Sequence, residues 1–192
     1  ERENFQTFRE DYYSDQMMPD GLPSPRANIR KILQHCRGFL ERFPNHENIL
    51  FQGSTGVGKT FLSHCIAKEI MDKGYTCVYT TAFQLFDYLA KHTFQREKEE
   101  DTERSLNMIF QCDLLIIDDL GTEMVNKFVV SQLFHCLNER LIREKSTIIS
   151  TNLSVKEFRD IYSERIFSRI IEHYSWHKIY GDDIRFKKSN LT

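Results

Sequence analysis

The stretch FQGSTGVGKTFL, residues 51–62, constrains the fold of this chain more than any other part of the sequence. Residues 53–60 match the pattern Gly-x-x-x-x-Gly-Lys-Ser/Thr at every fixed position. A short apolar stretch, NILFQG, leads into this loop, and apolar residues at helical spacing follow it from Thr60 to Lys73. The sequence therefore predicts a strand, a glycine-rich loop and a helix in succession, which is the repeating order of an α/β fold.

The residues of this loop suit the binding of a nucleotide's phosphates. Its glycines let successive backbone N–H groups turn inward, and the N-terminus of the following helix carries a partial positive charge. Lys59 is expected to reach the β- and γ-phosphates, and the Thr60 hydroxyl to coordinate Mg²⁺. A plain turn is the alternative, which the flanking strand and helix disfavour. The predicted nucleotide-binding residues are Gly53, Ser54, Thr55, Gly56, Val57, Gly58, Lys59, Thr60 and Phe61.

Strands and helices alternate through the rest of the chain. Strands are predicted at 48–53, 76–82, 113–121, 146–152 and 177–186, and helices at 60–73, 83–94, 125–141 and 155–173. The strand 113–121 is almost continuously apolar up to its acidic end, which is typical of a parallel strand covered on both faces, and 146–152 is expected to be another buried strand. A capping box of Ser154 and Glu157 opens the last helix. The expected fold class is α/β, with a central parallel sheet between two layers of helices.

Residues 1–45 follow a different pattern from residues 46–192. A Pro-rich break at 19–25 separates an aromatic stretch from a helix of about 15 residues. The aromatic residues are Phe5, Phe8, Tyr12 and Tyr13, and the helix positions expected to face inward are Ile29, Ile32, Leu33, Cys36 and Leu40. We predict an N-terminal strap and helix, 1–45, packed on a main domain, 46–192. An exposed aromatic docking segment is the alternative for the strap.

Polar residues stand at the ends of two predicted strands, where ligands bind in parallel sheets. Asp118 and Asp119 end the strand 113–121. Asp118 is expected to hold Mg²⁺ through water and Asp119 to polarise an attacking water, and a simple polar turn is the alternative. A second acid beside the metal ligand favours hydrolysis over transfer to a bound acceptor. Asn152, which ends the next strand, is expected to orient the water, with a turn-forming role as its alternative.

Two arginines, Arg165 and Arg169, lie four residues apart and hence on one face of the predicted helix 155–173, where like charges repel. Arg165 has no acidic residue three or four positions away, and Arg169 has only Glu172. A phosphate ligand would explain this pair of positive charges. A solvated basic face is the alternative.

Composition excludes several classes of protein. A hydrophobic content of 40% is typical of a globular domain, and a formal net charge of −2 gives no overall attraction to nucleic acid or anionic membrane. No apolar run approaches the ~20 residues of a membrane span, and no secretory signal opens the chain. Five cysteines without a Cys-x-x-Cys pair are typical of buried thiols in a reducing compartment, so we expect a cytoplasmic protein without a membrane partner.

Three further features receive weaker interpretations. The charged run 95–104 is more acidic than basic, so a solvated surface is favoured, although Lys91, Arg96 and Arg104 could line a groove for single-stranded DNA. His173 and His177 have the spacing of metal ligands, but no third ligand is nearby, so we do not expect a zinc site. Trp176 is expected to anchor the core.

Several motifs together resemble one family. GSTGVGKTFL, LLIIDDLG, STN, ERIFSRI and GDDIRFKK, in this order, resemble the AAA+ ATPase domain of bacterial replicative helicase loaders, the DnaC/DnaI family, and most of all its DnaI-type members. The IstB-like helper ATPases of insertion sequences share most of these motifs. The resemblance covers residues 5–188 and implies a three-layer P-loop NTPase of the AAA+/RecA-like class with little or no C-terminal lid.

The resemblance also implies roles for residues and partners. It implies an Mg²⁺-dependent ATPase that holds ATP or ADP, with Thr151 and Asn152 as the sensor of the γ-phosphate. Arg169 would be an arginine finger that acts on a neighbouring subunit's ATP, with Arg165 beside it. The implied partners are a replicative hexameric helicase, single-stranded DNA and further copies of the chain in head-to-tail contact. Many AAA+ proteins have Glu in place of Asp119, so we expect slow hydrolysis without a neighbour or partner.

Several questions stay open at this point. An IstB-like transposition helper, which would act on duplex DNA and a transposase, is one alternative. A small-molecule P-loop kinase is another, but it would need an arginine-rich lid and an acceptor pocket that the sequence does not display. The role of Arg185 in the GDDIR motif is undecided. Loaders of this type grip the helicase through a separate N-terminal domain, and whether one precedes Glu1 is also open.

Overall fold

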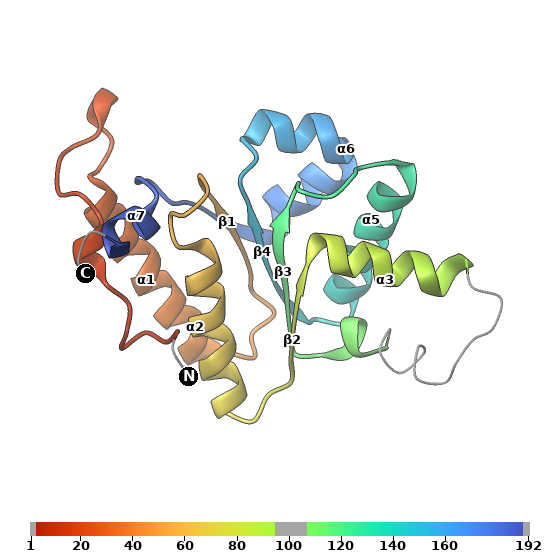
Figure 1. Ribbon diagram of the computed structural model, residues 1–192. Helices are drawn as coiled ribbons and strands as arrows, with labels where there is room; N and C mark the ends of the chain where they lie inside the picture. Colours follow the sequence, from red (N-terminus) through yellow and green to blue (C-terminus); the bar gives the residue numbers. More distant parts are fainter. Residues whose placement is uncertain (1–2, 95–106, 190–192) are drawn as a thin grey trace.

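The computed structural model describes residues 3–94 and 107–189 of the chain. Its five strands form one sheet in the order β2-β3-β4-β1-β5, and every neighbouring pair is parallel. The strands are β1 Asn48–Gln52, β2 Cys77–Thr81, β3 Leu114–Leu120, β4 Ser146–Thr151 and β5 Tyr174–Lys178. The predicted parallel α/β sheet is confirmed (Figure 1).

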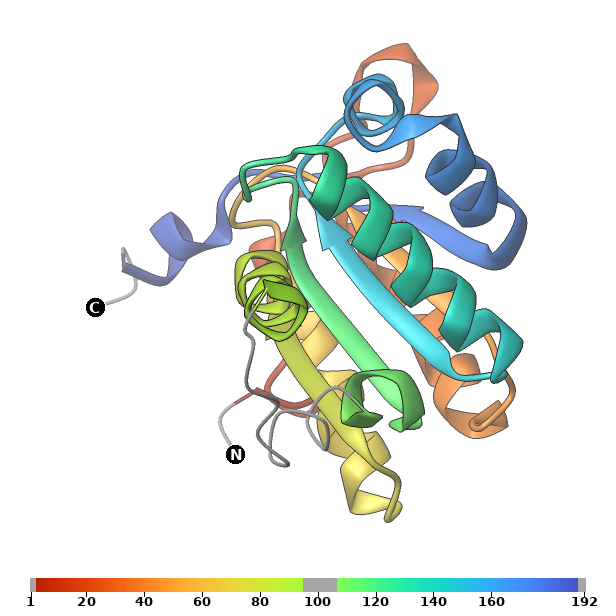
Figure 2. The same ribbon diagram turned by 90° about the vertical axis from the view of Figure 1, so that its right-hand side faces the viewer.

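Helices cover both faces of this sheet. They are α1 Pro25–Arg42, α2 Lys59–Asp72, α3 Ala82–Phe94, α5 Lys127–Ile142, α6 Val155–His173 and α7 Ile184–Ser189, with short 3-10 turns η1 Glu10–Tyr12 and η2 Pro19–Gly21. Helices α1 and α2 lie on one face, and α3, α5 and α6 on the other (Figure 1). Figure 2 shows α3 and α5 crossing the second face. The fold therefore has three layers, as the sequence predicts.

Each face of the sheet has its own apolar cluster. Successive residues of a strand point to opposite faces, so Ile49 and Phe51 of β1 join the cluster of α1 and α2, whereas Leu50 joins the cluster of α3, α5 and α6. The same alternation divides Ile116 from Ile117 in β3. Because both clusters exclude water from these side chains, consecutive positions of β3 from Leu114 to Ile117 are all apolar, and this makes the strand recognisable in the sequence.

The N-terminal residues pack on the side of α1 and α2. Tyr13 is only 2% exposed, and its hydroxyl donates to the carbonyl oxygen of Val57 in the glycine-rich loop at 2.8 Å. The Phe8 ring stacks on Tyr13 at 5.9 Å and meets Phe61 edge-on at 5.6 Å. The aromatic stretch is therefore a strap across the loop. Since α1 shares its apolar cluster with α2, the domain boundary at residue 45 stays a prediction.

The C-terminal part of the fold differs from the sequence prediction. The predicted strand 177–186 is wrong, because β5 starts at Tyr174, directly after α6. Tyr174 and Trp176 pair with residues of β1, a partner too far away in the sequence for the local pattern to reveal. The chain then leaves the sheet, turns at Gly181 with φ of 143° and forms α7.

Two helices also differ in detail. The predicted helix 155–173 is kinked, because Ser163 has φ of 78° and ψ of 154°, which is not helical. Helix α5 begins at Lys127, two residues later than expected, since the Asn126 side chain accepts the backbone N–H of Val129 and caps the helix. The capping box of Ser154 and Glu157 at the start of α6 is confirmed.

Two expectations from composition can be compared with the structure. Within residues 3–94 and 107–189, no helix combines the length and the apolar character that crossing a membrane requires. The five cysteines are free thiols, and all but the half-buried Cys77 are buried.

Candidate functional site

The glycine-rich loop connects β1 to α2 at the carboxyl edge of the sheet. Gly56 and Gly58 have φ of 79° and 97°, in the left-handed region that favours glycine. Gly58 is the N-cap of α2 and offers no side chain to the helix, so the first N–H groups of α2 are free to bind a ligand. The local geometry is that of an anion-binding loop, as the sequence predicts.

The lysine of the loop lies against the loop's own carbonyl groups. Lys59 Nζ donates to the carbonyl oxygens of Gly53 at 2.8 Å and Ser54 at 2.9 Å. Burial lowers the pKa of Lys59, and the carboxylates of Asp119 and Asp118 oppose this shift. An ammonium group has three protons, so Lys59 keeps one donor for an anion above the loop.

Asp118, at the end of β3, is the centre of a hydrogen-bond network. Its Oδ2 accepts the hydroxyl of Thr60 at 2.8 Å and the hydroxyl of Tyr79 at 2.6 Å, and its Oδ1 accepts the hydroxyl of Ser150. Burial, followed by the hydrogen bond to Asp118, raises the pKa of Tyr79, so this hydroxyl stays a donor. The structure thus joins the two residues predicted to hold Mg²⁺, Thr60 and Asp118, and adds two partners that the sequence did not indicate.

Asp119 follows with an unusual backbone and an exposed side chain. Its φ is 55°, a left-handed conformation that Asp tolerates better than most residues, and its N–H donates to Ser150 Oγ at 2.9 Å. Asp119 lines the loop cavity. Partial burial raises the pKa of Asp119, the Asp118 charge raises it further, and Lys59 opposes the shift.

A cavity of about 520 Å³ lies over the loop. Thr55, Gly56, Lys59 and Thr60 form its floor, and its walls come from both ends of the chain. The wall residues are Phe8, Arg9, Tyr12 and Tyr13 of the strap, and Ile184 and Arg185 at the start of α7. The volume is within the usual range for small-molecule and cofactor sites, about 300–1,000 Å³. The strap and the GDDIR motif lie more than 160 residues apart in the sequence, and nothing in their patterns indicates that they meet at this cavity.

The GDDIR motif closes the loop from the C-terminal side. The Ile184 N–H donates to the carbonyl oxygen of Gly56 at 3.0 Å, and the Asp183 carboxylate lies so close to Gly56 that a Cβ there would be 2.1 Å away. Arg185 Nε donates to Asp183 at 2.9 Å, so the charge of Arg185 is paired. A side chain at position 56 would therefore have to displace the Asp183 carboxylate, and the φ of 79° disfavours any residue other than glycine.

The remaining predicted site residues lie outside this cavity. Asn152 is exposed and directly follows β4, whose last residue, Thr151, accepts the N–H of Gly53 at 3.1 Å. Asn152 therefore shares the carboxyl edge of the sheet with the loop, but it does not line the cavity. Arg165 and Arg169 both follow the kink in α6, so they still share one helical face.

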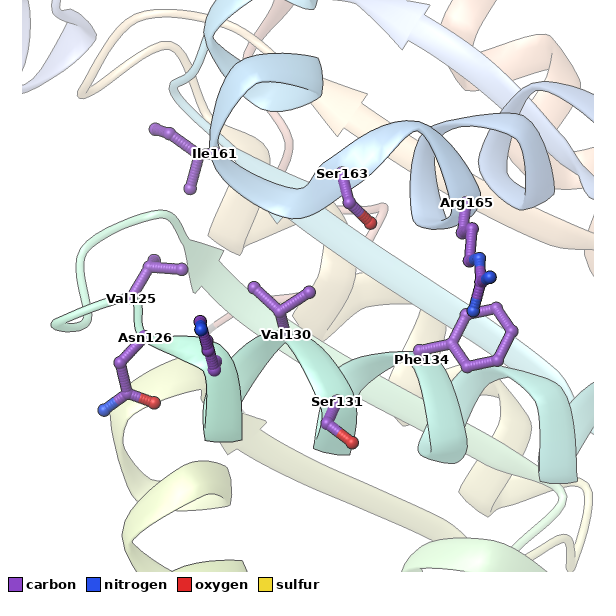
Figure 3. A pocket seen from close by; sticks show the side chains of 9 residues that line it. Val125, Asn126, Val130, Ser131, Phe134, Ile161, Ser163 and Arg165 are labelled. Atoms are coloured by element: carbon purple, nitrogen blue, oxygen red, sulfur yellow. The ribbon is translucent and has the colours of Figure 1, made fainter.

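Arg165 lines a second hollow, of about 520 Å³, between α5 and α6. Figure 3 shows its side chain above the Phe134 ring, beside Ser163. Arg165 is exposed and Arg169 half-buried, and in the part of the chain that the structure describes neither makes a hydrogen bond or an ion pair. These two arginines are thus separate from the nucleotide cavity of their own chain.

The weaker sequence interpretations have mixed outcomes. Lys91 forms an ion pair with Asp87 at 2.7 Å, whereas Arg96, Arg104 and the charged run 95–104 lie outside the described residues. Trp176 packs on Phe158 of the core, with ring centroids 5.8 Å apart, as predicted. His177 packs against the ring of His35 at 4.3 Å.

Comparison with known proteins places this geometry in a family. A family model described as IstB-like ATP binding protein matches residues 26–192. The insertion sequence IS21 putative ATP-binding protein of Pseudomonas aeruginosa is 26% identical over 166 residues, which are 83% of this chain and 60% of that protein. The replicative helicase loader DnaC of Escherichia coli (strain K12) is 27% identical over 139 residues, 72% of this chain and 56% of that protein. The chain therefore spans less than two thirds of either relative.

Solved structures confirm the fold class. The AMPPCP-bound DnaA of Aquifex aeolicus superposes with a TM-score of 0.72 at 23% identity, covering 99% of this chain and 55% of that one. Like this chain, it has the three-layer architecture of AAA+ P-loop NTPases, and the fold is of that class. Because the family match runs from the first turn of α1 to the last residue, the chain belongs to the IstB-like ATP-binding proteins.

Proposed function

We propose that this chain binds ATP with Mg²⁺, hydrolyses it, and uses the change of bound nucleotide as a switch that a partner detects. One observation carries the proposal. The Thr60 hydroxyl, at the start of α2, and the Asp118 carboxylate, at the end of β3, meet at 2.8 Å beside the ammonium-bearing loop. Two sequence motifs 58 residues apart thus bring a hydroxyl and a carboxylate oxygen together beside the phosphate loop.

The donor set fits a magnesium ion. Hydroxyl and carboxylate oxygens are the hard ligands that Mg²⁺ prefers, and the ion keeps several of its waters. Thr60 would bind the ion directly, and Asp118 would hold its waters. When bound, Mg²⁺ neutralises charge on the β- and γ-phosphates. The loop N–H groups and Lys59 would hold the same phosphates from the other side.

Hydrolysis requires an acceptor for a proton of the attacking water. Asp119 lines the cavity, and its carboxylate is not part of the hydrogen-bond network described for Asp118. Its pKa is raised, which suits a general base. Asn152, at the same edge of the sheet, would orient the water. The short Asp side chain reaches less far than the Glu of many relatives, so we propose that hydrolysis is slow until another subunit completes the site.

The completing group is proposed to be Arg169, with Arg165 beside it, from a neighbouring copy. Both arginines lie away from the cavity of their own chain and have no partner among the described residues. A positive charge at the transferring phosphoryl group would stabilise the charge that develops there. The contact would be head-to-tail, which can close into a ring or continue as an open spiral.

The biological partner is proposed to be a replicative hexameric helicase, delivered to single-stranded DNA in the cytoplasm. The match to the helicase loader DnaC supports this role. The matches to an insertion sequence protein and to the IstB-like family support a second candidate, a transposition helper that acts on duplex DNA. The net charge of −2 gives the chain no general affinity for duplex DNA, and for this reason we favour the loader role.

Binding of a fluorescent ATP analogue, with and without Mg²⁺, tests the central proposal. We expect Mg²⁺-dependent binding by the native chain, and no detectable binding by the Lys59→Ala variant. Lys68→Ala is the matched control, since Lys68 lies on the same helix but pairs with Asp72 away from the cavity. Unchanged binding by Lys59→Ala would refute the assignment of the site.

The two candidate partners can be separated by stimulation of hydrolysis. Phosphate release would be measured with a replicative helicase and single-stranded DNA in one reaction, and with a transposase and duplex DNA in another. Stimulation by the first pair alone supports the loader, and stimulation by the second alone supports the transposition helper.

A further inference from the structure

Tyr79, in β2, makes a contact at the metal position that the proposed mechanism does not use. Its hydroxyl donates to Asp118 Oδ2 at 2.6 Å, and the same oxygen accepts the Thr60 hydroxyl at 2.8 Å. β2 and β4 are the two neighbours of β3 in the sheet. Tyr79 of β2 therefore reaches Asp118 from one neighbouring strand, and Ser150 of β4 reaches it from the other. The carboxylate is thus held from both neighbouring strands.

The ring of Tyr79 is held in turn by α2 and by the N-terminal segment. The His64 ring packs on the Tyr79 ring with centroids 4.7 Å apart. His64 Nδ1 forms an ion-pair contact with the Glu3 carboxylate. Tyr79 is 40% exposed, so little else fixes its ring. A continuous line of contacts therefore leads from Glu3 through His64 and Tyr79 to Asp118.

We propose that Tyr79 is a positioning residue for the magnesium site, and that Glu3 and His64 hold it in place. This inference rests on the proposed function, because it assigns a partner to the proposed metal ligand. A carboxylate that holds metal-bound waters must present its oxygens in one orientation. Hydrogen bonds from the surrounding side chains provide that orientation, and their loss lowers metal affinity or activity by about 10- to 100-fold in well-studied sites.

The Tyr79 hydroxyl fixes the rotation of the carboxylate about its χ2 bond. Among the described residues, Ser150 is the one side chain that donates to Oδ1, and Thr60 must turn its oxygen toward the ion when Mg²⁺ binds. Without Tyr79, Oδ2 would then have no side-chain donor apart from Thr60 among those that the structure describes. The inference further gives the N-terminal segment a role at the metal site, since a shift of Glu3 would be transmitted to Asp118 through two rings.

The Tyr79→Phe variant tests this inference, because it removes one hydroxyl and keeps the ring. Binding of a fluorescent ADP analogue would be titrated with Mg²⁺, and direct binding of Mn²⁺ to the nucleotide complex would be followed by electron paramagnetic resonance. We expect the Mg²⁺ concentration for half-maximal effect to rise about 10-fold. Nucleotide affinity without metal should stay within about twofold of that of the native chain. His64→Ala should raise the Mg²⁺ requirement in the same direction by a smaller factor.

Tyr75→Phe is the matched control, since Tyr75 precedes the same strand but packs on Phe43. It should leave the Mg²⁺ requirement unchanged. The inference is overturned if Tyr79→Phe has the native Mg²⁺ requirement, or if it loses affinity equally with and without metal, which would indicate a structural role alone. Measurements on the native chain distinguish failure of this inference from failure of the proposed function. If it shows no Mg²⁺-dependent binding at all, the proposed function itself fails.

Discussion

The two regions proposed to act on ATP are built in opposite ways. Around the phosphate loop, Lys59, Thr60, Asp118 and Ser150 all have partners within the chain, and both ends of the chain pack over the loop. On α6, Arg165 and Arg169 have no hydrogen-bond or ion-pair partner among the described residues, and Arg165 lines an open hollow together with the non-helical Ser163.

The paired groups of the loop indicate a site that a single chain completes. The unpaired arginines of α6 indicate a site that a single chain leaves incomplete. Burial of charged groups is costly unless they are paired, so a preassembled cradle must satisfy its own ammonium and carboxylate groups before a ligand arrives. The exposed Arg165 and the half-buried Arg169 do not need such partners within the chain, since water reaches both. The two arginines of α6 can therefore remain solvated until a phosphate group of another subunit binds. The loop region, in contrast, has the geometry proposed for nucleotide binding within a single chain.

The largest effect should come from Arg169→Ala. Hydrolysis by the native chain should rise with protein concentration, because a neighbour supplies the arginine. Loss of such an arginine lowers the rate by about 10³- to 10⁵-fold in related phosphoryl-transfer systems. Phosphate release measured over a range of concentrations should therefore show no rise for the variant, whereas nucleotide affinity should be unchanged.

Arg159→Ala provides the control for this experiment. Arg159 is on the same helix but before the kink, and pairs with Glu164 at 3.5 Å. If Arg169→Ala hydrolyses ATP like the native chain at every concentration, α6 does not complete a neighbour's site, and the contrast between the two regions no longer holds.

Asp119→Asn should have the next largest effect, on the loop side of the comparison. The amide cannot accept a proton, and removal of a general base lowers the rate by about 10²- to 10⁴-fold. Because the Asp119 carboxylate makes no hydrogen bond to the loop in the described part of the chain, nucleotide binding should persist, and a single-turnover assay beside a binding assay would show this separation. Asp72→Asn, at the far end of α2, is the control. Equal loss of binding and hydrolysis would assign Asp119 to binding.

The sequence predicts those parts of the site whose pattern is local. The loop and the apolar run of β3 each contain their own signal, because the spacing of the glycines and lysine or the burial of consecutive residues is visible within the segment itself. The Tyr79 contact, in contrast, depends on β2 lying beside β3. The register of β5 depends on β1, so the sequence placed the strand at 177–186 although it starts at Tyr174, directly after the helix. Contacts between distant segments leave no periodicity in either segment.

The kink at Ser163 shows a second limit of sequence analysis. Serine at this position is compatible with helix by its propensity, and the apolar spacing continues on both sides of it. Tyr162, just before the kink, is fully buried, and its hydroxyl donates to Glu123 in the loop after β3. The conformation of Ser163 is thus set by packing around its neighbour, which the pattern of α6 itself does not contain.

A smaller effect, on the free energy of unfolding, is expected at acid pH. It comes from His177 of β5, which packs against His35 of α1. Burial, and in addition the nearby His35, lowers the pKa of His177 to about 4. Between the ordinary histidine pKa of about 6.5 and this value, only the unfolded chain takes up the proton. Stability is therefore complete above about pH 6.5 and is lost progressively as the pH falls toward about 4. After allowance for partial solvent exposure, we expect a loss of about 1–3 kcal/mol.

Urea unfolding at pH 7.5 and pH 5 would measure this loss. His177→Phe keeps an aromatic ring against His35 and Phe51 but cannot titrate, so its stability should fall less between the two pH values. His135→Gln, an exposed control on α5, should behave like the native chain. An unchanged pH dependence in His177→Phe would show that other groups cause the acid sensitivity. Because β5 pairs with β1, which leads into the phosphate loop, nucleotide binding should weaken over the same range.

The smallest effect should come from Ser163→Gly, on the α6 side. A φ of 78° with ψ of 154° is a region that only glycine adopts without strain, at a cost of about 1–3 kcal/mol for other residues. Glycine removes this strain but loses about 0.4–1 kcal/mol through greater freedom of the unfolded chain. The net gain of about 1 kcal/mol should raise the melting temperature by about 2–4 °C. Ser168→Gly, at a helical position of the same helix, should lower it, because glycine destabilises helix interiors. A lower melting temperature in both variants would mean that Ser163 is not strained. The α6 region would then differ from the phosphate loop only in its unpaired arginines.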